Sequence, residues 1–89
     1  MRAALEPRIR RARTLLARLG ELDAEEAGRD VALADDPHRA VWQAAASGLV
    51  SVADAQRLLE TDGLAARLER LTSLLDEELD VLALRARER

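Results

Sequence analysis

Apolar residues recur along this chain at intervals of three and four positions, the spacing of one face of an α-helix. No segment sustains the alternation of apolar and polar positions that would indicate a β-strand. Glycine, proline, serine or aspartate separates the periodic segments. We therefore expect an all-α fold, a compact bundle of four to five helices with a long C-terminal helix. The predicted helices span residues 3–19, 24–33, 37–47, 52–60 and 64–87.

The residues at the breaks are typical of helix ends. Gly20 suits the left-handed position that follows many helices. Asp23, Asp36 and Ser51 each precede a periodic segment and can accept a hydrogen bond from its first turn. Pro37, directly after Asp36, has a backbone already set for the first helical position. These residues support the predicted helix boundaries.

Length and composition restrict the class of protein. With 89 residues the chain has room for one small domain, and residues 1–89 are assigned to it. A hydrophobic content of 48 % is too high for intrinsic disorder. The absence of cysteine excludes disulfide scaffolds and cysteine-ligated metal sites. The helical stripes predict a core that contains Ile9, Leu16, Trp42, Leu59, Leu68, Leu71 and Leu75.

Charge is unevenly distributed along the chain, whose formal net charge is −3. Residues 1–20 carry six arginines against Glu6, and residues 21–36 carry seven acids against Arg29. The arginines of the first helix are interpreted as a solvated face that partly neutralises the acidic stretch. Nucleic-acid binding through this helix is the alternative, which the net acidic charge and the lack of interleaved aromatic residues disfavour. All 14 basic residues are arginine, which we attribute to coding bias.

The sequence offers little for catalysis. His38 is the single histidine, the serines have no evident base partner, and the isolated glycines form no phosphate-binding loop. The acids at positions 76–80 lie within one predicted helix and are interpreted as a solvated face. We therefore predict no enzyme activity, no catalytic residue, no metal and no cofactor. Because no run of residues resembles a membrane span or a secretory signal, the prediction is a cytoplasmic protein without a membrane partner.

Two polar residues fall on apolar sides of predicted helices. Gln56 lies beside Leu59, and Glu78 lies within the leucine stripe of the last helix. A half-buried carboxylate needs a partner, which Arg67 or a neighbouring helix N-terminus would supply. We expect these residues to form hydrogen bonds inside the bundle that fix the register of the helices. A role in ligand binding is the alternative.

A family pattern is visible over about residues 35–84. It consists of Asp36 and Pro37, then Gln56, Leu58, Leu59 and Glu60, then Arg67 and Leu68, and finally Glu78 in a leucine-rich helix. This pattern resembles the C-terminal helical part of the Lon substrate-binding domain. That domain forms the N-terminal region of ATP-dependent Lon proteases, and it also occurs in bacterial proteins without the protease and ATPase parts.

The sequence also departs from this family. Protease members tend to have Leu-Ala-Asp after the Asp-Pro pair, whereas residues 40–42 here are Ala-Val-Trp. The resemblance therefore points to a stand-alone relative. The β-rich half that precedes this region in the family has no counterpart in the 89 residues, so the resemblance implies part of a larger domain.

The leading hypothesis for function follows from this resemblance. It implies a non-catalytic module that engages unfolded or tagged polypeptides, or that packs within a larger protein. The first alternative is a module that associates with itself as a homodimer. The second alternative is the nucleic-acid binder described above. The dimer face would use leucines and a valine that lie off the main stripes: Leu15, Leu22, Leu74, Val81 and Leu84.

Overall fold

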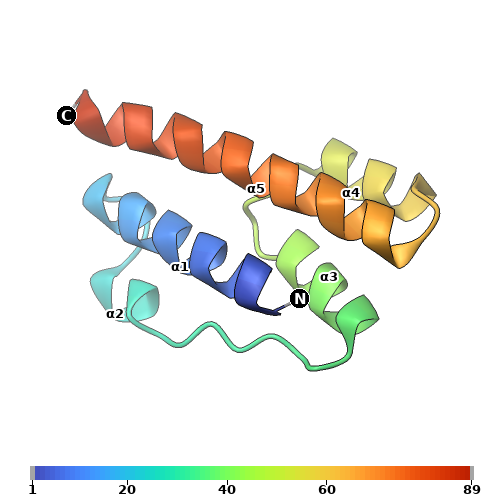
Figure 1. Ribbon diagram of the computed structural model, residues 1–89. Helices are drawn as coiled ribbons and strands as arrows, with labels where there is room; N and C mark the ends of the chain where they lie inside the picture. The colour runs from blue at the N-terminus through green and yellow to red at the C-terminus, as the bar shows by residue number, and fades with distance from the viewer. Residues whose placement is uncertain (1, 89) are drawn as a thin grey trace.

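The computed structural model describes residues 2–88, which form five α-helices and no β-strand (Figure 1). The predicted all-α fold with a long C-terminal helix is confirmed. Four of the five helices lie within two residues of their predicted bounds, and the second does not. The helices are α1 (Arg2–Arg18), α2 (Ala24–Ala27), α3 (Pro37–Ala45), α4 (Val52–Glu60) and α5 (Leu64–Arg87).

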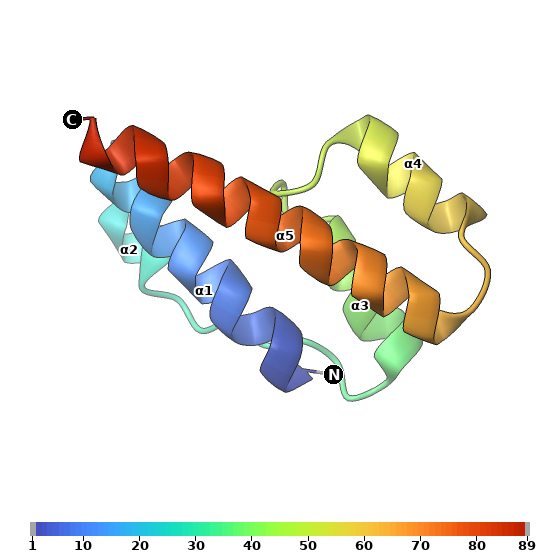
Figure 2. The same cartoon turned by 45° about the horizontal axis from the view of Figure 1, so that its top comes forward.

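Helix α5 is the axis on which α1, α3 and α4 pack, whereas α2 packs on α1. Its 24 residues span about 36 Å at 1.5 Å per residue, close to the 39 Å long dimension of the molecule. Helix α1 lies along α5 and runs in the same direction (Figures 1 and 2). Two ion pairs connect residues that this parallel arrangement brings together: Arg8 near the start of α1 with Asp76, and Glu21 just after α1 with Arg85.

The core consists of two clusters along α5. The larger one joins α1, α3, α4 and α5 around Leu5, Ile9, Val41, Leu58 and Leu71, with Val31 from the segment before α3. The smaller one joins the C-terminal halves of α1 and α5, and its members are Ala12, Leu15, Leu19 and Leu82. The two clusters share no buried residue, although the partly buried Leu49 packs against both.

The predicted core is confirmed in part. Ile9, Leu71 and Leu75 are buried. Leu16, Trp42 and Leu68 are only partly buried and pack at the edges of the clusters.

The prediction that Leu59 is buried was wrong. Leu59 is 52 % exposed, and the adjacent Leu58 is fully buried. Leu58 is the single buried residue of α4, and successive residues of a helix point about 100° apart. Only one of the two leucines can therefore face α5. The same choice places Leu15 in the core instead of Leu16.

Local capping occurs where the sequence predicts it. The side chains of Asp23, Asp36 and Ser51 each accept a backbone N–H from the first turn of the following helix. Gly20 has a φ of 74°, and its N–H bonds to the Ala17 carbonyl as in a Schellman motif. A β-carbon would be strained at this φ, so glycine is the residue that ends α1 cleanly.

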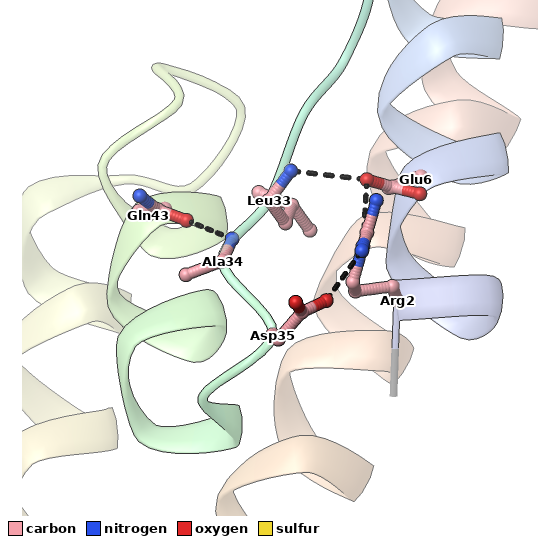
Figure 3. Close-up of polar contacts among 6 residues, drawn as sticks. All are labelled: Arg2, Glu6, Leu33, Ala34, Asp35 and Gln43. Atoms are coloured by element: carbon pink, nitrogen blue, oxygen red, sulfur yellow. Dashed lines mark hydrogen bonds and ion pairs between the residues drawn. The ribbon is translucent and has the colours of Figure 1, made fainter.

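The second helix is much shorter than predicted. It ends at Ala27, and residues 28–36 run without helix to the start of α3. Figure 3 shows what holds this segment: a Glu6 carboxylate oxygen accepts the Leu33 N–H at 3.0 Å, and the Gln43 amide oxygen accepts the Ala34 N–H at 2.8 Å. These bonds from α1 and α3 replace the bonds of a helix, and Val31 is buried against the larger cluster.

Glu6 should make stability depend on pH. The hydrogen bond from the Leu33 N–H is the largest cause that lowers the pKa of Glu6 below its ordinary value of 4.5. Desolvation opposes it, and Arg2 and Arg10 lower this pKa further. A depressed folded-state pKa adds stability above the unfolded-state value, and this stability is lost as the pH falls through the folded-state value. The wild type should therefore have a higher free energy of unfolding than Glu6→Gln at pH 7. This difference should shrink as the pH falls from 7 through the folded-state pKa of Glu6.

Urea midpoints measured at a series of pH values test this expectation. Glu69→Gln is the matched control, because Glu69 is exposed and lies outside the contacts around Leu33. A constant difference in midpoint between the wild type and Glu6→Gln across the acidic range would contradict the expectation.

Candidate functional site

An apolar groove of about 410 Å³ lies between α3 and α4. Leu58 is the one buried residue of α4, and this helix lies against α5 and apart from α3 (Figure 2). We call this feature the α3–α4 groove. Its lining residues come from α3, from the connection and from α4: Trp42, Ala45, Ala46, Gly48, Val50, Val52, Ala55, Gln56 and Leu59.

The lining has large apolar residues beside small ones. Val52 and Leu59 lie seven residues apart on one face of α4, and they are 88 % and 52 % exposed. Trp42 faces them from α3, and alanine and glycine form the parts between. No charged residue lines the groove, and the amide of Gln56 is its one polar side chain. The surface is therefore apolar and neutral, with room between its large side chains.

Arg67 connects the two sides of the groove. Its guanidinium lies over the Trp42 ring, 5.7 Å from the centroid, and its Nε donates to the Thr61 carbonyl at 2.7 Å. Thr61 directly follows α4, so one side chain of α5 contacts both the aromatic residue of α3 and the end of α4. Arg67 thus bridges α3 and the end of α4 beside the groove.

The hydrogen bonds expected for Gln56 and Glu78 are absent among residues 2–88. Gln56 is exposed and lines the groove, so its amide is open to an incoming group. Glu78 is half-buried in a shallow depression beside Ser51 and Asp54, at the start of α4. Arg67 does not reach Glu78, since its guanidinium is engaged with Trp42 and Thr61. The prediction of register-fixing hydrogen bonds was therefore wrong for both residues. Glu78 does lie at the N-terminus of a neighbouring helix, one of the two partners expected for it.

The residues of the family pattern have different structural roles. Asp36 and Pro37 begin α3, Leu58 holds α4 in the core, and Leu68 packs beside it. Gln56, Leu59 and Arg67 are the three that form or position the groove. Glu60 is exposed.

Sequence reasoning did not find the groove, because it assigned Trp42 and Leu59 to the core. The available signal was the Val52-to-Leu59 stripe on a helix too short to bury two faces.

The predicted dimer face does not form as a single surface. Leu15 and Leu74 are buried in the core, and Leu22 is partly buried. Val81 and Leu84 remain about half exposed, both at 51 %. Self-association stays a prediction, and it would have to use a different set of residues from the one expected.

The arginines of α1 are partly neutralised within the chain. Arg2 pairs with Glu6 and Asp35, and Arg8 pairs with Asp76. The ion pair to Asp35 joins the basic helix to the acidic stretch at residues 21–36, as the interpretation of a solvated, neutralising face expects. Nucleic-acid binding itself stays a prediction.

Within residues 2–88, no group of three or more acidic or histidine side chains could hold a metal ion. None of the helices in this range has the length and hydropathy that crossing a bilayer requires. Comparisons with protein-family models, with curated proteins and with solved structures gave no match, so the resemblance to the Lon substrate-binding domain stays a prediction.

Proposed function

We propose that this chain is a non-catalytic polypeptide-binding module, and that the α3–α4 groove receives a short apolar segment of its target. The observation that carries the proposal is the neutral apolar lining, which leaves Val52 and Leu59 exposed. Covering such side chains with apolar groups removes them from water, which is favourable by about 25 cal/mol per Å².

The chemistry of the lining specifies the target further. A neutral groove offers no ion pair, so recognition relies on apolar side chains that fit between Trp42 and Leu59. The Gln56 amide has both a donor and an acceptor, which match the N–H and C=O groups of a peptide backbone. Unfolded or tagged polypeptides, the targets implied by the resemblance, carry such segments.

Trp42 provides a direct test, because it is the sole tryptophan of the chain and it lines the groove. The probe is a tryptophan-free, uncharged synthetic peptide with leucines at i, i+3 and i+7 among serines and glutamines. Binding is expected to shift the Trp42 emission to shorter wavelength in a saturable titration. Failure of this peptide to bind or to shift the emission would contradict the proposal.

Two variants locate the binding site. Val52→Asp and Leu59→Asp place a charge on the groove and should each weaken peptide binding on the order of tenfold, because burying such a side chain contributes about 1.5–3 kcal/mol. The matched control is Val81→Asp, because Val81 is an apolar residue outside the groove that is as exposed as Leu59, at 51 % against 52 %. Equal weakening by Val81→Asp would show that the peptide binds elsewhere. Circular dichroism would verify that all three variants fold.

A further inference from the structure

A second concave surface lies at the other end of the molecule, along the seam between α1 and α5. It has a volume of about 460 Å³, and four charged residues surround it: Arg11 and Arg18 from α1, Asp80 and Arg87 from α5. Its floor includes Leu15, Ala83 and Leu84. We call it the basic hollow. It shares no lining residue with the α3–α4 groove.

The two helices present similar patterns to the basic hollow. Arg11, Leu15 and Arg18 follow one face of α1 at i, i+4 and i+7. Asp80, Leu84 and Arg87 have the same spacing on α5. Because the helices are parallel, Arg18 and Arg87 come together at one end, and positive charge concentrates there.

The charged side chains around the basic hollow have no partner within residues 2–88. All four charged residues of the basic hollow are exposed, and none forms an ion pair or side-chain hydrogen bond with the part of the chain that the structure describes. In contrast, Arg2, Arg8 and Arg85 all have carboxylate partners. Arg18 and Arg87 do offset the negative ends of the two helix dipoles, but a dipole leaves the donor groups of a guanidinium free for an external acceptor.

We propose that the basic hollow binds an acidic amphipathic helix of a partner protein. The half-exposed Leu84 and the alanines of the floor would contact the apolar face of that helix. Carboxylates at the edges of the same face would pair with Arg18 and Arg87. The seam between two packed helices is a groove into which the side chains of a third helix fit.

Charge decides between this occupant and the others. A second copy of the chain would bring six arginines against two aspartates, twice the content of one hollow, and would be repelled. A nucleic acid would place phosphates over an apolar floor without an aromatic residue, and the chain as a whole carries a charge of −3. An acidic helix satisfies both the apolar floor and the arginines.

The test uses two fluorescein-labelled helical peptides that differ in charge alone. Both carry leucines at i, i+4 and i+7, and these are flanked by glutamates in one peptide and by glutamines in the other. In fluorescence anisotropy at low salt, the glutamate peptide is expected to bind on the order of tenfold more tightly. The difference should disappear near 1 M salt, where the screening length is about 3 Å. Equal affinity at low salt would overturn the proposal.

Matched arginine variants locate the site. The double variant Arg18→Gln/Arg87→Gln should weaken binding of the glutamate peptide on the order of tenfold. The control Arg39→Gln/Arg70→Gln removes the same charge from exposed positions outside the hollow and should leave the affinity nearly unchanged. Equal losses in the two double variants would overturn the proposal, since the attraction would then come from net charge alone.

Two further outcomes separate the alternatives. Trp42 emission should stay constant when the glutamate peptide binds, whereas a shift would place this peptide in the α3–α4 groove and overturn the proposal. Competition with duplex DNA and with phosphatidylserine vesicles gives the second outcome. If either displaces the glutamate peptide at a lower concentration than the unlabelled peptide does, the proposal is overturned in favour of a nucleic acid or a membrane. The Trp42 titration with the uncharged peptide is independent of the anisotropy measurements with the glutamate peptide. Either of the two proposals can therefore be overturned without the other.

Discussion

Leu58→Ala is expected to lower the free energy of unfolding by about 2–5 kcal/mol, the usual cost of removing a fully buried leucine side chain. For a domain of this size the total is roughly 4–13 kcal/mol, so the variant would lose a large share of its stability. Leu58 is also the single buried residue of α4. Its loss should release α4 from α5 and remove one wall of the α3–α4 groove.

Leu59→Ala is the matched control, because it removes the same atoms from the next residue of the same helix. Leu59 is 52 % exposed, so its truncation should change the free energy of unfolding by no more than about 1 kcal/mol. Urea denaturation measures both variants. Leu59→Ala should still weaken peptide binding at the groove, whereas Leu58→Ala should reduce stability and binding together. Similar stability losses in the two variants would contradict the assignment of Leu58 as the anchor.

Leu82→Ala should produce a loss of similar size, about 2–5 kcal/mol, at the opposite end of the molecule. Leu82 is 1 % exposed and is the one buried residue that α5 contributes to the smaller cluster. The larger cluster does not include it. We therefore expect the C-terminal halves of α1 and α5 to open locally more often, because local stability follows local packing.

Amide hydrogen exchange read residue by residue tests this prediction. Exchange in Leu82→Ala should accelerate most around Leu15 and in the last turns of α5, and less around Val41 in α3. Leu84→Ala is the control, since Leu84 lies two residues further along α5 and is 51 % exposed. Uniform acceleration across both clusters would show that they form one cooperative unit and would contradict the prediction.

The helices and their ends could be predicted from the sequence, because they depend on interactions between residues that are close along the chain. The period of apolar residues and the caps at Asp23, Asp36 and Ser51 involve groups a few residues apart. The second helix was wrongly extended beyond Ala27 because its alternative is not local. Leu33 is held by Glu6, 27 residues away, and Ala34 by Gln43, nine residues away. No window of neighbouring residues contains those bonds.

The binding surfaces were harder to predict from the sequence than the fold. Trp42 and Leu59 look like core residues in the sequence, since a large apolar side chain on a helical stripe is usually buried. Whether they are covered depends on how closely α4 approaches α3. Leu58, packed in the larger cluster, and Arg67, in contact with Trp42 and Thr61, join α4 to its neighbours. A groove between two helices depends on the distance between them, and the apolar periodicity of each helix gives no information about that distance.

The sequence by itself determined that this chain is helical, where most of its helices begin and end, and that its charges divide into a basic and an acidic segment. The tertiary structure decided which leucine is buried in the adjacent pairs Leu15–Leu16 and Leu58–Leu59, because a helix stripe is wider than its contact with a neighbour. It also gave Arg11, Arg18 and Arg87 a common surface. The parallel packing of α1 on α5 brings their C-terminal ends together, and residues about 70 positions apart then share one hollow.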